Sequence, residues 1–224
     1  MMSTTKLHNA NIATTHVVPK KRLAVFISGN GSNLQALIDA CQQNSINGDI
    51  ALVISDNEKA YGLTRAKLNT IDTHVVQKQH IETIIPLLQA YRIDGIVLAG
   101  FLTILPEQLI KHYRHRIINI HPSLVPAFCG KAFYGQRVHQ AVFEKGVRFT
   151  GATTHFVDEG VDTGPIILQR VVALSCDDTP ETIAQKVLQL EHPLLIQTVQ
   201  LFCQNRLSVE NNRVIIPTIT DKNN

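Results

Sequence analysis

The sequence predicts an α/β fold, in which a mostly parallel, twisted β-sheet has helices on both faces and two antiparallel strands towards the C-terminus. From residue 23 to residue 120, short apolar runs alternate with segments of helical periodicity. This spacing suits right-handed crossovers between parallel strands. Residues 150–157 and 165–174 are also β-rich. The segment 158–164 between them is too short for a crossover helix, so these two strands are expected to be antiparallel.

Strands and helices are predicted to alternate through the first half of the chain. The strands span residues 23–28, 50–55, 73–76, 95–99 and 116–120. The helices span residues 34–41, 59–68, 86–91 and 106–110. Pro86 suits the first turn of its helix, where a missing backbone N–H costs no hydrogen bond.

The second half of the chain is predicted to begin with a loop at residues 126–131 and a helix at 136–144. The two antiparallel strands follow. A short hairpin with strands at 207–209 and 214–216 closes the fold.

A long helix is predicted between the antiparallel strands and the hairpin. Thr179 is placed as its cap and Pro180 as its first residue. Its apolar face includes Ile183, Val187, Leu190 and Leu194. Pro193 lies inside this pattern and is expected to kink the helix.

Length and composition fit one sizeable domain. The chain has 224 residues, of which 44% are hydrophobic and 17% are charged, so it can bury a full core. We place this domain at residues 22–217, between a disordered or tag-like extension at 1–21 and a polar tail at 218–224.

Charge and cysteine usage narrow the possible partners. The formal net charge is +3, from 21 Lys and Arg against 18 Asp and Glu, and the dense basic cluster is confined to 20–22. Nucleic acid is therefore not favoured as a partner, whereas small anionic metabolites suit a mildly positive protein.

The four cysteines form no C-x-x-C pair, which argues against a zinc ribbon and favours a reducing, cytoplasmic location. No apolar run is long enough to span a membrane.

Asn119 and His121 form the first candidate site. They lie two residues apart at the end of a predicted strand, so their side chains share one face. Pro122 cannot donate to a sheet ladder and marks the end of that strand, which places both polar groups at the carboxyl edge, where open α/β sheets bind ligands. An amide beside a protonated imidazole offers two donors to a developing oxyanion. On this spacing alone, a strand-end Asn and a packed His are the preferred alternative.

The sequence Gly-Asn-Gly-Ser-Asn at residues 29–33 forms the second candidate site. A loop of small residues between a strand and a helix can hold a phosphate through backbone N–H groups and the helix dipole. No lysine follows the glycines, so this is not a Walker loop, and Leu34 occupies the third glycine position of a dinucleotide fingerprint. Taken alone, the loop is as consistent with a plain tight turn as with a phosphate site.

Three blocks of sequence together resemble the phosphoribosylglycinamide formyltransferase family. They are Ser-Gly-Asn-Gly-Ser-Asn-Leu at 28–34, Asn-Ile-His-Pro-Ser-Leu at 119–124, and His-Phe-Val at 155–157 followed by Asp-Thr-Gly-Pro at 162–165. Their order and approximate spacing are those of the family. The resemblance implies a Rossmann-like formyltransferase fold. It also implies transfer of the formyl group of 10-formyltetrahydrofolate, as co-substrate, to the amine of phosphoribosylglycinamide in purine biosynthesis, without a metal.

The resemblance implies a catalytic role for Asn119, His121 and Asp162. The Asn119 amide and a protonated His121 would stabilise the oxyanion that forms on the formyl group, at ~3 kcal/mol per donor. The carboxylate of Asp162 would keep the imidazole charged. His121 would carry a proton from the amine to folate N10, directly or through a water. Asp158 and Glu159 lie nearer to the strand end and compete for the carboxylate role, but Asp162 matches the family position.

The resemblance also implies which residues bind the two substrates. The ribose phosphate would be held by Gly31, Ser32 and Asn33. Glu191 would lie near the glycinamide amine, unless it is simply an exposed helix residue. The folate would meet Asn119 and, chiefly through the backbone, the loop residues Leu102, Thr103, Ile104 and Leu105. His155 matches a family histidine close to the site, although a strand histidine is often only packed.

The chain departs from the family near the folate tail. Many relatives have an arginine where this chain has Thr103, and the connection 76–80 is shorter and lacks a second arginine. Lys78 is the cation near that connection. The stretch 128–134 also differs from the commonest version. We therefore expect catalysis to be unaffected, whereas the contact with the glutamate tail of folate is open.

Three other functions are compatible with parts of the sequence. Formyltetrahydrofolate deformylase shares an Asn-His-Asp site but usually carries a preceding regulatory domain, for which the extension 1–21 is too short. Methionyl-tRNA formyltransferase has a similar His-Pro-Ser block but adds a C-terminal RNA-binding domain that this length excludes. A non-catalytic nucleotide-binding module would explain the glycine loop and the parallel sheet, but not the convergence of three catalytic residues. The expected partners are therefore glycinamide ribotide and formylfolate, and a monomer and a homodimer both remain open.

Overall fold

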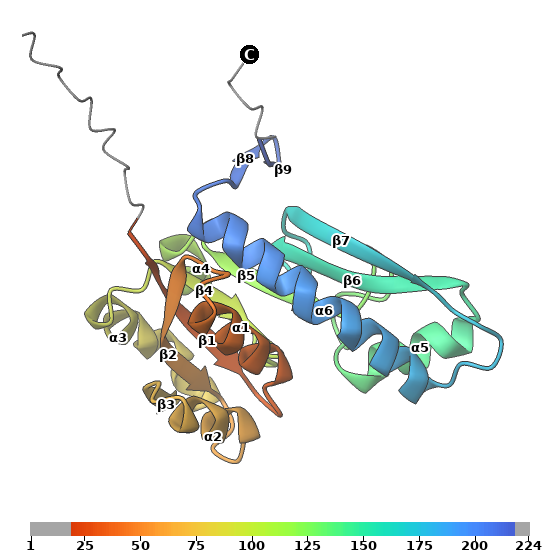
Figure 1. Ribbon diagram of the computed structural model, residues 1–224, viewed down its shortest axis with the longest axis horizontal. Helices are drawn as coiled ribbons and strands as arrows, with labels where there is room; N and C mark the ends of the chain where they lie inside the picture. The colour runs from red at the N-terminus through yellow and green to blue at the C-terminus, as the bar shows by residue number, and fades with distance from the viewer. Residues whose placement is uncertain (1–18, 218–224) are drawn as a thin grey trace, which may run out of the picture.

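The computed structural model describes residues 19–217, which form one large sheet with helices packed on both faces (Figure 1). The seven strands of this sheet have the order β3-β2-β1-β4-β5-β6-β7. Neighbouring strands from β3 to β5 are parallel, whereas β5 with β6 and β6 with β7 are antiparallel. The predicted fold class is confirmed. The predicted tail at 218–224 and most of the extension at 1–21 lie outside the described residues.

The elements of the first half follow the predicted alternation. They are β1 (Lys21–Ile27), α1 (Ser32–Gln42), β2 (Gly48–Ser55), α2 (Tyr61–Leu68), β3 (Thr73–Val75), the 3₁₀ helix η1 (Lys78–Ile84), α3 (Ile85–Ala90), β4 (Gly95–Leu98), α4 (Glu107–His112) and β5 (Ile117–His121).

The second half contains the antiparallel strands and the longest helix. Its elements are α5 (Gln136–Lys145), β6 (Phe149–Phe156), β7 (Ile166–Ala173), α6 (Pro180–Cys203), β8 (Ser208–Glu210) and β9 (Arg213–Ile215). The last two strands pair as a separate hairpin.

Several boundaries differ from the sequence prediction by one or two residues, and one element was not predicted. Lys21 was assigned to the extension but is the first residue of β1. Helix α2 begins at Tyr61 rather than at residue 59, because Asn57 first makes a turn in which its Oδ1 accepts the N–H of Lys59. The 3₁₀ helix η1 was not predicted, and it occupies the connection that contains Lys78.

The sheet separates two apolar clusters, and β1 contributes to both. Leu23, Val25 and Ile27 pack in the cluster under α1, α2, α5 and α6. Ala24 and Phe26 point the other way, into the cluster under η1, α3 and α4. All five side chains are fully buried, as expected for a central parallel strand covered on both faces.

The order of the strands places the functional loops. The chain passes from β1 outward to β2 and β3, and then returns to β4 on the other side of β1. The loops that leave the carboxyl ends of β1 and β4 therefore diverge at a topological switch point, where α/β sheets bind ligands. Strand β5, with Asn119 and His121 near its carboxyl end, is the next neighbour of β4.

Helix α6 packs against β6, β7, α1 and α5. It continues through Pro193 without interruption. The hydroxyls of Thr198 on α6 and Thr154 on β6 are both buried and lie 2.8 Å apart. A pair of residues that satisfy each other in the core fixes the helix against the sheet. Among residues 19–217, no helix is long and apolar enough to cross a membrane.

We predict that Thr179→Ala destabilises the protein by about 1 kcal/mol, measured by denaturant unfolding. Thr179 caps α6 as expected, because its hydroxyl accepts the N–H of Thr182 at 3.3 Å and its own N–H donates to the Thr182 hydroxyl at 2.8 Å. Thr64→Ala, at an exposed position inside α2, is the matched control and should cost nothing measurable. Equal losses in the two variants would contradict the capping role.

Candidate active site

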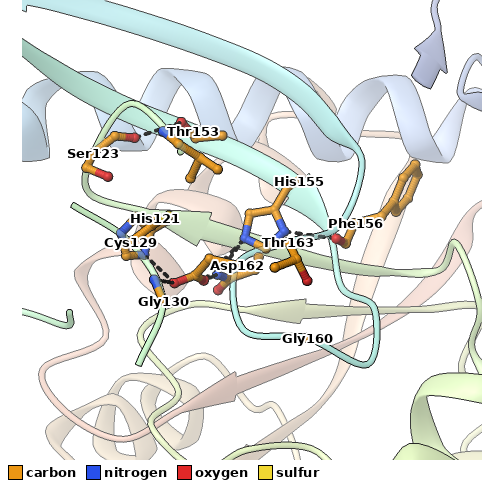
Figure 2. A network of polar contacts seen from close by, with 12 residues as sticks. His121, Ser123, Cys129, Gly130, Thr153, His155, Phe156, Gly160, Asp162 and Thr163 are labelled. Atoms are coloured by element: carbon orange, nitrogen blue, oxygen red, sulfur yellow. Dashed lines mark hydrogen bonds and ion pairs between the residues drawn. The ribbon is translucent and has the colours of Figure 1, made fainter. Parts of the chain in front are cut away.

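The carboxylate of Asp162 lies between the imidazoles of His121 and His155 (Figure 2). Its Oδ1 accepts the amide of Asn119 at 3.3 Å, and its Oδ2 accepts the backbone N–H of Gly130 at 2.9 Å. Nδ1 of His121 is 3.5 Å from Oδ2. Asn119 and His121 come from β5, and Asp162 comes from the β6–β7 loop (157–165). The predicted catalytic residues are thus brought together.

The imidazole of His121 is held by a backbone carbonyl. Its Nε2 lies 2.9 Å from the oxygen of Phe128, and because a carbonyl only accepts, Nε2 carries the hydrogen. In the neutral ring, Nδ1 is then the basic nitrogen, and it faces Asp162. The hydroxyl of Ser123 donates to the carbonyls of Ala127 and, at 3.2 Å, of Phe128. The loop after β5 therefore determines the tautomer of His121.

His155 orients the amide of Asn119. Nδ1 of His155 faces the carbonyl of Phe156 at 2.9 Å and must donate to it, so Nε2 of the neutral ring can accept. The amide nitrogen of Asn119 lies 3.1 Å from that Nε2. His155 is buried in β6 and directly opposite Asn119 in the sheet. It is therefore packed, and it also fixes which end of the Asn119 amide presents hydrogens.

Burial lowers the pKa of His121, although Asp162 and the Phe128 carbonyl raise it and the neighbouring His155 lowers it further. The sequence analysis expected Asp162 to hold the ring charged. Asp162 does raise the pKa as expected, but burial of the side chain, which is only 5% exposed, has the larger effect. The neutral form of the ring is therefore more favoured than in a free histidine.

Asp162 remains ionised in the same surroundings. Burial would raise the pKa of its carboxyl, but the protonated forms of His155 and His121 and the N–H of Gly130 together lower the pKa below its ordinary value. The N–H of Gly130 donates to Asp162 regardless of the charge on the two histidines. Part of the stabilisation of the carboxylate therefore does not depend on their protonation. A negative charge therefore faces Nδ1 of His121 in the resting protein.

A cavity of about 300 Å³ opens in front of these groups. Its walls are three loops: the β4 loop (99–105), residues 130–135 after β5, and the β6–β7 loop. Leu102 and Ile104 are 53% and 72% exposed on the β4 loop, and Tyr134 is 44% exposed on the facing wall. Apolar walls with a few polar groups at one end are typical of small-molecule sites.

The β4 loop is tied to the ends of two neighbouring strands. The N–H of Leu102 donates to the hydroxyl of Ser28 at 2.9 Å. The Thr103 hydroxyl donates to Asp56 at 2.6 Å, so the threonine that stands in place of the family arginine points to a carboxylate after β2. All five residues predicted for folate line the cavity: Asn119 and the loop residues Leu102, Thr103, Ile104 and Leu105.

The predicted acceptor residues lie outside this cavity, at the start of α1. The helix has no side-chain cap, so its first N–H groups, at Ser32 and Asn33, remain available to an anion. Gly31 has φ 74°, and a Cβ there would lie 2.7 Å from Cα of Gly62. Packing of α1 on α2 therefore requires this glycine, whether or not a phosphate binds.

Glu191 joins the acceptor loop to α6. Its Oε2 accepts the amide of Asn33 at 2.6 Å. Burial raises the pKa of the Glu191 carboxyl, and the hydrogen bond from Asn33 offsets part of this increase. The alternative of a simply exposed helix residue is wrong, because the side chain is half-buried and bonded to a residue of α1.

Sequence analysis missed two backbone groups, the carbonyl of Phe128 and the N–H of Gly130. Phe128 has φ 50° and Gly130 has φ 88°, so both lie in the left-handed region that favours glycine. The glycine was visible in the sequence, but nothing in the pattern of a loop shows where its N–H points. Among the described residues, no group of three or more His, Cys, Asp or Glu side chains is arranged to hold a metal.

Residues 21–199 match the formyl transferase family. The chloroplastic phosphoribosylglycinamide formyltransferase of Arabidopsis thaliana is 38% identical over 219 residues, covering 94% of this chain and 74% of that protein. The structure of glycinamide ribonucleotide transformylase 1 from Symbiobacterium toebii superimposes with a TM-score of 0.83 at 38% identity, covering 89% of this chain and 95% of that one. A formyltetrahydrofolate deformylase from Pseudomonas syringae has a TM-score of 0.81 at 28% identity, covering 89% of this chain and 66% of that one.

We predict that Gly164→Ala destabilises the protein by about 2 kcal/mol or more and displaces Asp162. A Cβ on Gly164 would lie 1.9 Å from the carbonyl oxygen of Phe156, in backbone that cannot move without opening the β6–β7 loop. Thermal unfolding and formyl-transfer activity measure the two effects. Gly29→Ala is the control for stability, because nothing lies within 4 Å of the added Cβ. Unchanged unfolding of Gly164→Ala would contradict this account of the loop.

Proposed function

The chain belongs to the formyl transferase family, and on that premise we propose that it transfers the formyl group of 10-formyltetrahydrofolate to the amine of N1-(5-phospho-ribosyl)glycinamide. The products are formylglycinamide ribotide and tetrahydrofolate. It is therefore an enzyme, a phosphoribosylglycinamide formyltransferase of purine biosynthesis.

One observation supports this function above the others. Asn119, His121 and Asp162 meet at the carboxyl end of β5, and they form one end of an apolar cavity between loops. A non-catalytic nucleotide module requires no such convergence. The cavity is a suitable place for the flat rings of a folate, and the polar end is where the formyl group would react.

We assign the stabilisation of the negative charge that develops on the formyl oxygen to Asn119 and His121. When the amine attacks the formyl carbon, the formyl oxygen becomes an oxyanion that needs hydrogen-bond donors. The Asn119 amide now directs its hydrogens at Asp162 and His155, at 3.3 and 3.1 Å. The longer of these contacts is the one that the oxyanion replaces. His155 keeps the amide turned in the required direction.

We assign the transfer of a proton to Nδ1 of His121. The neutral ring of the free protein is ready to accept a proton from the attacking amine, directly or through a water. The resulting imidazolium faces the carboxylate of Asp162, which stabilises it while the oxyanion exists. The same proton is then delivered to folate N10 as the carbon–nitrogen bond breaks. In this proposal the catalytic cycle starts from the neutral ring, whereas the sequence predicted a ring that Asp162 holds protonated.

The remaining assignments concern binding. The folate pterin is placed against the β4 loop and Asn119, and the ribose phosphate is placed at the N–H groups of Gly31, Ser32 and Asn33. The carboxylate of Glu191 is directed by its 2.6 Å hydrogen bond with Asn33 towards the acceptor. A cytoplasmic location and a monomeric or homodimeric state stay predictions, and one relative is chloroplastic by name.

The central experiment measures tetrahydrofolate release from 10-formyltetrahydrofolate with and without glycinamide ribotide. We expect release to depend on the ribotide and formylglycinamide ribotide to accumulate in equal amount. Release at the same rate without the ribotide, with free formate as product, would identify a deformylase instead. No release under either condition would leave only a binding module.

We predict that Asp162→Asn lowers kcat by about 10²-fold, by analogy with the loss of an oxyanion donor. The substitution keeps the shape of the side chain but removes the charge opposite Nδ1 of His121. A carboxylate favours the imidazolium, so its loss lowers the pKa of His121, and the ring is then charged only at still lower pH. An NMR pH titration of the ring and the pH dependence of kcat measure both effects. The KM values of the two substrates should change far less.

Glu159→Gln is the matched control for that substitution. Glu159 belongs to the same loop, but its carboxylate pairs with Arg114 at 3.8 Å and does not contact His121. We expect its kcat and the pKa of His121 to stay near those of the unmodified protein. The same His121 pKa in the Asp162 variant and the unmodified protein would reduce Asp162 to a structural residue of the loop.

A further inference from the structure

Helix α2 holds the acceptor loop (29–33), which is proposed to bind the ribose phosphate. The N–H of Gly62 donates to the carbonyl of Gly29 at 3.1 Å. Nε of Arg65 donates to the carbonyl of Asn30 at 2.9 Å, and its Nη2 donates to Oδ1 of the same residue at 3.0 Å. Two successive carbonyls of the loop are therefore held by one helix, outside the cavity of the catalytic groups.

The side chain of Arg65 is fixed by more than these two bonds. Its guanidinium carbon lies 4.9 Å from the centroid of the Tyr61 ring, one helical turn earlier, and a planar cation stacks well on an aromatic face. Its Nη1 lies 3.5 Å from Oε1 of Gln35 on α1. Because α1 and α2 approach each other closely at Gly31 and Gly62, Arg65 can reach the loop from the neighbouring helix.

The bond from Arg65 to the carbonyl of Asn30 sets the direction of the next N–H. The peptide bond between Asn30 and Gly31 is trans. In a planar trans peptide, the C=O and the N–H point in opposite directions. Since Arg65 holds the carbonyl towards α2, the N–H of Gly31 points away from α2.

The N–H of Gly31 is one of several polar groups here that lack a partner. Gly31 is buried, and its N–H has no acceptor within residues 19–217. Its left-handed backbone, φ 74° and ψ 33°, is followed by the right-handed Ser32, and such a pair makes successive N–H groups converge on an anion. Asn33 is only 7% exposed, and its Oδ1 also has no partner in this range. Buried polar groups are rarely left unpaired, so a ligand is the expected partner.

We propose that Arg65 is a positioning residue that directs the N–H of Gly31 at the acceptor phosphate, and that it thereby makes the enzyme select a phosphorylated acceptor. The assignment rests on the proposed function. Arg65 acts through Asn30, because its Nε and Nη2 are both engaged there. A guanidinium presents two donors in a fixed planar geometry, which the ammonium of a lysine does not reproduce.

The first test compares two acceptors, glycinamide ribotide and glycinamide riboside, which lacks the phosphate. In Arg65→Met we expect the KM of the ribotide to rise about 10-fold, the effect of losing one hydrogen bond to a charged group. The KM of the riboside, the KM of formylfolate and kcat should stay unchanged. Arg65→Lys keeps the charge but not the paired donors, so it should show most of the same loss.

Lys67→Met is the matched control. It removes a positive charge from the last turn of the same helix, and the exposed Lys67 side chain makes no hydrogen bond or ion pair within residues 19–217. This variant should retain the full preference for the ribotide. Full retention in Arg65→Met would overturn the proposal, and so would an equal rise in the KM of the riboside. Full retention in Arg65→Lys would show that charge alone is needed and would overturn the positioning role.

A binding measurement separates this proposal from the proposed function. Inorganic phosphate is titrated into the ¹⁵N-labelled protein at constant ionic strength, and the amide resonance of Gly31 is followed by NMR. We expect a saturable shift in the unmodified protein and in Lys67→Met, whereas Arg65→Met should need about 10-fold more phosphate. An unchanged response in Arg65→Met, or none in the unmodified protein, would overturn the proposal. Failure of formyl transfer together with the expected phosphate response would overturn the proposed function and still support the orientation of the loop by Arg65.

Discussion

A buried carboxylate is the constraint on which the site depends. Asp162 is 10% exposed and cannot stay charged there without compensation. Its partners come from three places: Asn119 and His121 from β5, Gly130 from the loop after β5, and His155 from β6. The residue itself has a left-handed backbone, φ 57°, of a kind that persists only where the surroundings hold it. Satisfying one charge therefore fixes the position of each group that we assign to the chemistry.

The order of the strands explains why two substrates can meet at this charge. Because β1 and β4 are neighbours whose connections run in opposite directions, the loops after them open a crevice at one edge of the sheet. Ser28 connects the two sides of that crevice, since its hydroxyl accepts the N–H of Leu102 while the residues after it form the turn into α1. The end of β1 thus holds both the loop at 29–33, proposed for the acceptor, and the β4 loop at 99–105, which lines the cavity. Strand β5 places the proposed catalytic groups beside them.

Burial and charge together lower the pKa of both His121 and Asp162, which favours a neutral ring and an ionised carboxylate. Loss of hydration makes His121 a weaker base than a free histidine, whereas the backbone N–H of Gly130 helps to keep Asp162 ionised. A neutral base beside a permanent negative charge can accept a proton when the amine attacks and is stabilised once it has done so. This arrangement suits a reaction in which the proton is taken up and given back within one turnover. It requires no charge on the imidazole in the resting protein.

The sequence alone determined the fold class and the alternation of elements, and its motifs selected the three candidate catalytic residues, because apolar periodicity and short motifs depend on neighbouring residues. Asn119 and His121 share a face by strand geometry, and Thr179 caps a helix by local hydrogen bonding. Only the tertiary structure decided which groups surround them. The lowered pKa of His121 depends on desolvation by segments distant in sequence, and its tautomer depends on the direction of the Phe128 carbonyl. The bond between Asn33 and Glu191 joins residues 158 positions apart. Contacts of this kind depend on how loops and helices fold over the sheet, which no local pattern encodes.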